Sequence, residues 1–317
     1  MTSAPVWVEQ AAHGDERALA RWISRIEAGD PTAIAALRGV RSRTGRARVV
    51  GVTGAPGSGK STLVDALIAV ARAREERVAV LAVDPSSPFS GGAILGDRIR
   101  MARWHADEGV FVRSMAARGH LGGLAAATLQ VVALLDAVGF DTVLVETVGV
   151  GQSEVEVAAA VDTTVVVLTP GQGDGVQAVK AGLMEVADVF VVNKADQGGA
   201  ERVVRDVRAS LALAGPPAPD AWLPPVLTCV ASRASGVAEV DEALSRHEQH
   251  VRRHGGLIRK RRGRVREEVR ALMAEAARRA LAQVDDAALD EVIDGGRAPD
   301  EVAIAALGRA VRSGRVD

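Results

Sequence analysis

The spacing of apolar residues changes near residue 48, and this change separates a helical part of the chain from a mixed one. Between Trp7 and Val40 apolar residues recur at helical spacing, with a break and restart at Gly29-Asp30-Pro31. This pattern predicts two or three short helices. The basic stretch 41–48 carries Gly45 and predicts a linker.

Beyond this linker, short runs rich in Val and Leu alternate with helical segments such as 61–74 and 121–138. The runs show little apolar and polar alternation, which is typical of strands buried on both faces. Strand and helix in turn predict an α/β fold with a mainly parallel sheet covered by helices on both faces. The predicted strands are Arg48–Val52, Val78–Val83, Thr142–Val145, Thr164–Leu168, Val189–Val192 and Val226–Cys229.

Past Gly236 the pattern is helical again, breaks at Gly255-Gly256 and resumes in an arginine-rich segment. One apolar stripe follows this segment and must pack on another surface. The stripe consists of Ile258, Val265, Val269, Leu272 and Ala276.

Composition narrows the class of protein. The 317 residues are 48% hydrophobic and 25% charged, as in a soluble globular chain. Basic and acidic residues nearly cancel, 39 against 40, so no global field favours nucleic acid or a membrane surface. The single cysteine, Cys229, excludes a disulfide framework and suits a reducing cytoplasm. No signal peptide or membrane span is expected.

A phosphate-binding loop directly follows the first predicted strand. Its sequence, Gly54-Ala55-Pro56-Gly57-Ser58-Gly59-Lys60-Ser61-Thr62, fits the P-loop pattern GxxxxGK[ST] and leads into a helical segment. Glycines let backbone N–H groups turn toward phosphate oxygens, and Lys60 can reach the β- and γ-phosphates. Ser61 would bind Mg²⁺ through its hydroxyl. The alternative, a chance glycine turn opening a helix, fits this context less well.

A second motif concerns the base. Asn193-Lys194-Ala195-Asp196 follows the strand 189–192. The Asp196 carboxylate can accept from guanine N1–H and the amino group, whereas adenine has no donor at N1. The order and spacing of the two motifs predict GTP and GDP as the bound nucleotides, although a four-residue motif alone is also compatible with a polar loop.

Acidic residues between these motifs are candidates for the magnesium and γ-phosphate shell. Glu146 ends the strand 142–145 and can hold the Mg²⁺ shell, while the Gly149 amide can meet the γ-phosphate. Asp84 and Asp97 are further candidates, with a turn before proline and a helix N-cap as their structural alternatives. Gln152 is either a water-orienting residue or an ordinary surface glutamine.

With these residues in place, the chain resembles the MeaB/ArgK-type GTPases associated with methylmalonyl-CoA mutase over nearly its whole length. The resemblance is carried by the glycine loop and by four further blocks. They are Asp84-Pro85-Ser86-Ser87-Pro88, Gly96-Asp97-Arg98-Ile99-Arg100-Met101, Glu146-Thr147-Val148-Gly149-Val150-Gly151-Gln152-Ser153-Glu154 and Asn193-Lys194-Ala195-Asp196.

The resemblance implies a homodimeric GTPase chaperone that gates adenosylcobalamin loading onto its mutase and protects that enzyme. It places Asp84, Asp97 and Glu146 in the magnesium and switch shell. It also implies a mutase-responsive loop at 174–180, with Arg100 and Lys180 supporting hydrolysis. The implied division is an N-terminal helical extension at 1–45, a P-loop GTPase domain at 46–245 and a C-terminal helical dimerisation arm at 246–317.

The chain departs from the family pattern at two places, and neither changes the assignment to the family. The second guanine-contacting loop, usually Ser-Ala, is Val230-Ala231 here, so its contact would be through the backbone only. Arg98 and Ile99 stand where lysine and threonine are common.

Four other functions compete with this interpretation. The client can instead be isobutyryl-CoA mutase, and the older family name implies an arginine or ornithine transport kinase. A nickel-delivery chaperone would need His-rich tracts, which six scattered His and one Cys do not provide. Residues 246–270 hold ten basic and three acidic side chains, but without interleaved aromatics a nucleic-acid role is disfavoured.

The lysine count points to the same site. Of the 39 basic residues, 35 are arginine and four are lysine: Lys60, Lys180, Lys194 and Lys260. The first three fall inside the proposed site. Because an ammonium is compact and a guanidinium is too broad for a closed glycine loop, lysine is needed there for its shape as well as its charge.

Overall fold

A seven-stranded parallel sheet forms the centre of the molecule. The computed structural model describes residues 6–12, 14–85, 101–117, 126–147, 153–171, 181–213, 218 and 220–313. The strand order is β3-β2-β4-β1-β5-β6-β7, and all neighbouring pairs are parallel, which confirms the predicted fold class. The strands are β1 (Arg48–Thr53), β2 (Val78–Pro85), β3 (Val110–Ala117), β4 (Thr142–Thr147), β5 (Thr163–Leu168), β6 (Val189–Val192) and β7 (Val226–Thr228).

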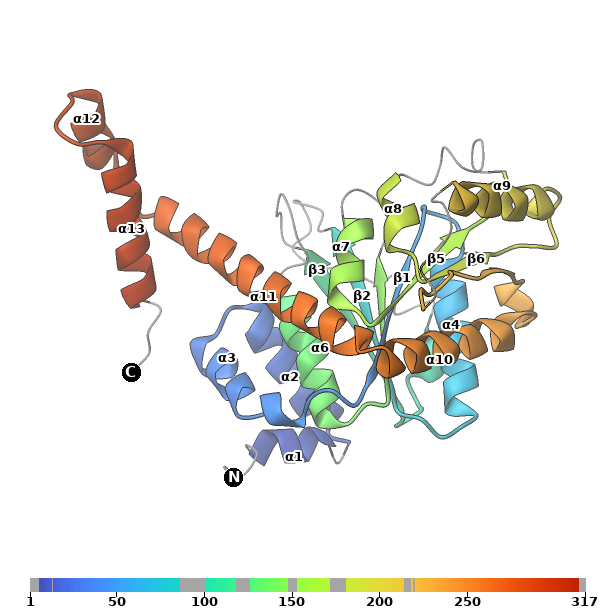
Figure 1. Cartoon of the computed structure of the whole chain (residues 1–317). Coiled ribbons are helices and arrows are strands. Elements are labelled where there is room, and N and C mark those ends of the chain that lie inside the picture. Colours follow the sequence, from blue (N-terminus) through green and yellow to red (C-terminus); the bar gives the residue numbers. More distant parts are fainter. Residues whose placement is uncertain are drawn as a thin grey trace.

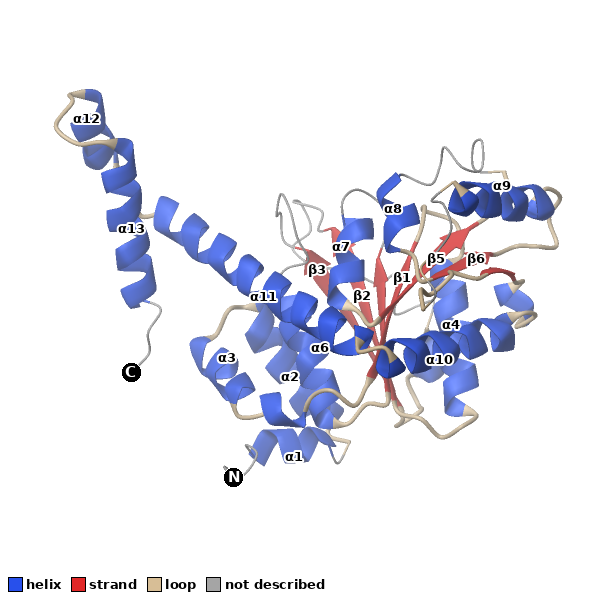
Figure 2. Cartoon of the chain, viewed as in Figure 1, coloured by secondary structure: helices blue, strands red, loops and turns tan. Residues whose placement is uncertain are grey.

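Helices cover both faces of this sheet (Figures 1 and 2). One face packs against the N-terminal helices, α6 and α7, and near β6 against α8 and α9, while α4 and α10 cover the other. The helices before α10 are α1 (Val6–Ala12), α2 (Glu16–Glu27), α3 (Pro31–Arg38), α4 (Lys60–Arg72), α6 (Ala126–Val138), α7 (Ser153–Ala160), α8 (Ala181–Val186) and α9 (Ala200–Ala212). Those at the C-terminal end are α10 (Val237–Arg253), α11 (Gly256–Leu281), α12 (Asp286–Ile293) and α13 (Pro299–Ser313).

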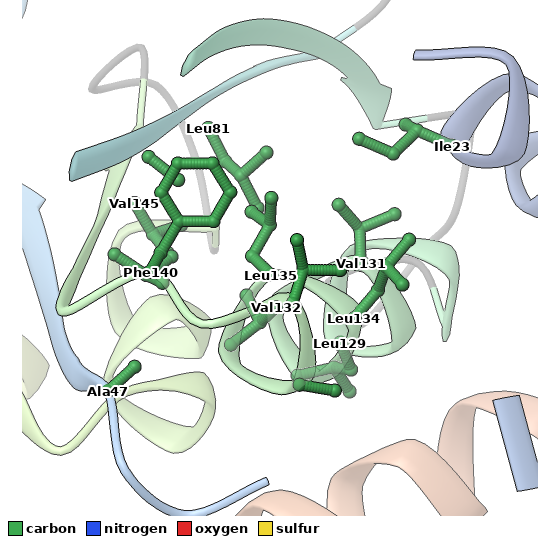
Figure 3. Close-up of a cluster of buried hydrophobic side chains, with 14 of the residues drawn as sticks. Ile23, Ala47, Leu81, Leu129, Val131, Val132, Leu134, Leu135, Phe140 and Val145 are labelled. Carbon is green, nitrogen blue, oxygen red and sulfur yellow. The ribbon is translucent and has the colours of Figure 1, made fainter. Parts of the chain in front are cut away.

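Side chains of β4 show why the strands lack polar alternation. Val143 and Val145 pack into the cluster that contains the N-terminal helices, whereas Leu144 packs into the opposite cluster with α4. Figure 3 shows the first cluster, which contains Val145 of β4 and Leu135 of α6. Each buried Val or Leu contributes about 1.5–3 kcal/mol, so both faces of the strand must be apolar.

The N-terminal helices belong to the same core. Ile23 of α2 is fully buried in the cluster of Figure 3. Asp30 caps α3 by accepting from Thr32 N at 2.8 Å, which confirms the break and restart predicted there. The stretch 41–48 is held in place as well, because Asp136 of α6 accepts from the backbone N–H of Gly45, Arg46 and Ala47 at 2.6–3.0 Å.

The long helix α11 runs outward from the body and carries α12 and α13 at its far end (Figure 1). It begins after Gly255, whose φ of +66° is a left-handed conformation that suits glycine. α13 packs along the distal part of α11. Of the predicted apolar stripe, Ile258, Val265 and Val269 remain exposed in the chain.

Ion pairs and a hydrogen bond attach the first part of α11, residues 256–268, to the body. Arg264 meets Asp162 at 2.6 Å, just before β5, and Lys260 meets Asp188 at 2.5 Å, just before β6. Arg261 Nη1 donates to Gly45 O at 2.7 Å. Much of the basic character of this segment therefore serves to attach the helix.

Two features differ from the sequence prediction or qualify it. The strand β3 was not among the predicted strands, and the expected domain boundary at 245/246 lies inside α10.

Among the described residues, no helix combines the length and apolar character needed to cross a membrane.

Candidate functional site

The glycine loop lies between β1 and α4, at the carboxyl edge of the sheet. Gly54 has φ +138°, and a Cβ there would lie 2.2 Å from Val167 O. Gly59 has φ +89°, and its Cβ would lie 2.2 Å from Asn193 Nδ2. Both positions therefore require glycine, for backbone conformation and for space.

Lys60 and Ser61 open α4 directly behind this loop. The Lys60 side chain is buried, and its Nζ donates to Gly54 O at 2.8 Å and Ala55 O at 3.0 Å. The Ser61 hydroxyl donates to Glu146 Oε1 at 2.6 Å. Glu146 lies near the end of β4 and is buried, so the structure brings together the predicted phosphate-contacting lysine and two predicted magnesium ligands.

A pocket of about 410 Å³ opens above these side chains. It is bounded by the glycine loop, by the ends of β2 and β4, and by Lys194 on the other side. The first turn of α4 faces it, so the N–H groups of that turn and the positive end of the helix dipole are directed toward an anion bound there.

The base-recognition motif is bonded to the glycine loop. Asn193 Nδ2 donates to Ser58 O at 3.0 Å, and Lys194 Nζ donates to Gly57 O at 2.8 Å. Lys194 also has a left-handed φ of +57°. The two side chains hold the loop after β6 against the phosphate loop and leave the lysine stem along the pocket wall.

Asp196 lies outside the residues that line this pocket and is partly exposed. Arg233 Nη2 approaches its Oδ2 at 3.8 Å. Val230 and Ala231 lie on the same side, and Ala231 N donates to Asn193 Oδ1 at 3.0 Å. The predicted base-contacting residues therefore lie near one another, and of these Lys194 lines the pocket.

Several predicted site residues lie outside the described residues. These are Asp97, Arg100, Gly149, Gln152 and Lys180, and the switch loop 174–180. Only the backbone of Asp84 is described. It lies at the carboxyl end of β2, paired with Ala116, one residue beyond the pairing of Val83 with Thr147.

One side chain near the site was missed by sequence reasoning. Asp65 lies one helical turn after Ser61, accepts from Trp104 Nε1 at 2.7 Å and from Arg103 Nε at 2.8 Å, and so attaches the turn at Ala102–Trp104 to α4. Arg103 and Trp104 are almost forty positions away from Asp65 along the chain. Neither Asp65 nor these two partners belong to a recognisable sequence motif.

A parallel sheet with a glycine loop between β1 and α4, and an Asn-Lys-x-Asp loop after β6 bonded to it, defines a P-loop GTPase. The family model for the methylmalonyl-CoA mutase-associated GTPase MeaB matches residues 19–285. The chain belongs to this family, as the sequence predicted, and it is a GTPase.

Known proteins similar to this chain agree with the assignment. A putative GTPase of Pyrococcus abyssi is 47% identical over 268 residues, covering 84% of this chain and 83% of the relative. The GTPase ArgK of Escherichia coli is 39% identical over 243 residues, covering 75% and 73%. The solved structure of an LAO/AO transport system kinase superposes with a TM-score of 0.69 at 27% identity, covering 96% of each chain.

Proposed function

We propose that this protein is a Mg²⁺-dependent GTPase that acts as a chaperone of methylmalonyl-CoA mutase, gating the loading of adenosylcobalamin and protecting the mutase. The observation that carries the proposal is membership of a mutase-associated GTPase family over residues 19–285. The pocket adds a chemical basis, because the phosphate loop and the base-recognition loop are already connected there.

The donor set suits magnesium. Ser61 Oγ and a Glu146 carboxylate oxygen meet at 2.6 Å beside the pocket, and Mg²⁺ prefers hard oxygen ligands. These two residues, with Asp84 and Asp97 as further candidates, would hold the ion. When bound, it neutralises charge that develops on the phosphates.

The chain's own groups then position GTP for attack by water on the γ-phosphate. The N–H groups of the glycine loop hold phosphate oxygens, and Lys60 can exchange its carbonyl partners for the β- and γ-phosphates. No arginine is among the described residues that line the pocket, so intrinsic hydrolysis should be slow. The Gly149 amide would meet the γ-phosphate, and by resemblance Arg100 and Lys180 would support hydrolysis once the mutase-responsive loop at 174–180 closes.

A second copy of the chain is the proposed partner of the exposed stripe on α11. Ile258, Val265 and Val269 of this stripe lie exposed along the outward helix, and Met273, next to Leu272 of the stripe, is exposed as well. A soluble protein rarely leaves a continuous apolar surface uncovered, and pairing of two copies would bury it.

The client can be identified by capture. The protein is loaded with GDP or a non-hydrolysable GTP analogue and mixed with purified methylmalonyl-CoA mutase or isobutyryl-CoA mutase. We expect nucleotide-dependent capture of methylmalonyl-CoA mutase, together with faster GTP hydrolysis and altered cofactor loading. Lys60→Ala is the control, because it removes the phosphate-contacting charge. Equal behaviour with and without the mutase would refute the chaperone role, and selective capture of isobutyryl-CoA mutase would reassign the client.

Phosphate transfer is the alternative activity, since one solved structure similar to this chain is that of a transport system kinase. Incubation with GTP labelled at the γ-phosphate, in the presence of arginine, ornithine or protein acceptors, separates the two reactions. We expect all of the label in free phosphate. Label in an amino acid or a protein would favour the kinase.

A further inference from the structure

The single cysteine of the chain is buried beside the base-recognition loop. Cys229 directly follows β7 and is 2% exposed. Its backbone N donates to Val192 O at 2.9 Å, and its carbonyl accepts from Ala195 N at 3.0 Å. The backbone of Cys229 is therefore bonded on both sides of Asn193, to the last residue of β6 and to Ala195 within the base-recognition motif.

Its side chain points at Asn193. The thiol Sγ lies 3.4 Å from Asn193 Oδ1, and this oxygen also accepts from Ala231 N at 3.0 Å. On the other side of the amide, Asn193 Nδ2 donates to Ser58 O at 3.0 Å. Two donors face the oxygen and a carbonyl faces the nitrogen, so the network fixes the orientation of the amide.

We infer that the Cys229 thiol is a positioning residue for nucleotide binding, which holds the Asn193 amide in the orientation that joins the base-recognition loop to the phosphate loop. The thiol acts through Asn193 and does not itself touch the nucleotide. The inference concerns nucleotide binding alone, so it stands or falls separately from the identity of the mutase.

Protonation and packing support this role. Burial raises the pKa of the Cys229 thiol to about 11, so near neutral pH the group stays an S–H donor. A thiolate would repel the Asn193 oxygen. The surroundings leave little room to shift, because a Cβ on Gly59 would lie 2.2 Å from Asn193 Nδ2 and one on Gly236 would lie 3.2 Å from Cys229 Cβ.

The test is a substitution series read by the dissociation rate of a fluorescent GDP analogue. Cys229→Ala and Cys229→Val remove the donor and bracket the thiol in size, whereas Cys229→Ser restores a donor. Because one hydrogen bond contributes about 0.5–1.5 kcal/mol, we expect both Ala and Val to release GDP about threefold to tenfold faster. The Ser variant should stay within about twofold of the wild type.

Val226→Ala is the matched control. Val226 lies in β7, just before Cys229, but packs in the cluster with α9, away from Asn193. It should lower the melting temperature and leave GDP release unchanged. Wild-type release from Cys229→Ala and Cys229→Val, or equal release from the Ser and Ala variants, would overturn the inference.

Labelling of the wild-type thiol tests the same point without any substitution. Because Cys229 is the only cysteine, a small thiol reagent gives a single signal. We expect slow labelling that GDP slows further, since the nucleotide keeps the base-recognition loop on the phosphate loop. The same labelling rate with and without GDP would contradict the inference.

Discussion

At the scale of single residues, the contacts of the few lysines explain why lysine is kept at these positions in a chain that otherwise uses arginine. Lys60 and Lys194 both donate to carbonyls of the glycine loop. Lys60 is buried between the carbonyls of Gly54 and Ala55, where a narrow ammonium fits, whereas the Lys194 contact is exposed. The fourth lysine, Lys260, meets Asp188 away from the residues that line the pocket.

Replacing Lys60 by arginine tests whether shape matters as well as charge. Lys60 Nζ lies 2.8 Å from Gly54 O and 3.0 Å from Ala55 O, so a guanidinium has no space without opening the loop. We expect Lys60→Arg to lower GTP turnover by about 10²-fold or more, as when a catalytic charge contact is lost. Single-turnover phosphate release measures the effect. Lys260→Arg makes the same chemical change outside the pocket and should hydrolyse GTP normally; equal rates in both variants would contradict the explanation.

Asp196 is the residue that we propose reads the base. An asparagine there keeps the size of the side chain but presents a donor to guanine N1–H, while it matches the carbonyl of xanthine. We expect Asp196→Asn to weaken GTP binding by at least about 10²-fold and to gain affinity for XTP. Competition between the two nucleotides for the labelled-GDP site measures the change. Unaltered preference for GTP would show that Asp196 does not read the base.

At the scale of elements, the helix α11 depends on charges placed at the amino ends of two strands. Asp188, just before β6, contacts Lys260 of α11 and His247 of α10 at 2.5 and 3.1 Å. Burial alone would raise the pKa of Asp188, but its contacts with His247 and Lys260 hold this pKa below the usual 3.8. The charged carboxylate therefore stabilises the folded chain.

The sign of the pH dependence follows from this lowered pKa. The stabilisation by Asp188 is complete above the unfolded pKa of 3.8 and is lost as the pH falls from there through the folded pKa. We expect Asp188→Asn to lower the free energy of unfolding by about 3 kcal/mol at neutral pH and to flatten its acid dependence. Denaturant unfolding at pH 7 and near pH 3.5 measures both. Glu291→Gln, in the exposed pair with Arg297 at 3.3 Å, should change little, and the same loss in both variants would contradict the assignment.

The sequence alone predicts most strands of the sheet and the two main motifs of the candidate site, but it does not predict every strand or every site residue. The six predicted strands, which include the edge strand β7, are found because each is a short apolar run. The other edge strand, β3, carries Arg113 within it, and this residue pairs with Glu27 of α2. A polar residue in an edge strand breaks the apolar run that marks a buried one. The glycine loop and the base motif are local in sequence and predictable, but Asp65 and Cys229 act through partners that only the folded chain brings near.

At the scale of the whole molecule, the body and the outward helix have different surfaces. The body buries its apolar residues in three clusters, while α11 to α13 leave a series of large apolar side chains exposed. Much of the basic character near the start of α11 is taken up by Asp162, Asp188 and the linker carbonyl of Gly45. The surface that remains along this helix carries exposed apolar side chains, such as Val265, Val269 and Met273, together with exposed arginines, such as Arg262, Arg266 and Arg270. The apolar side chains are the part that a second copy of the chain would cover.

The dimer proposed from this surface can be tested by substituting one exposed apolar residue of α11 with a charged residue. Val269 is 49% exposed midway along α11, and pairing of two copies through the stripe would bury it. We expect Val269→Glu to weaken the dimer by at least about 100-fold, because burying an unpaired carboxylate costs several kcal/mol. Light scattering after size exclusion should then change from twice 32.9 kDa to 32.9 kDa. Leu213→Glu, at an 88% exposed apolar residue after α9, is the matched control and should stay dimeric. A wild-type monomer at micromolar concentration, or a dimeric Val269→Glu variant, would place the interface elsewhere.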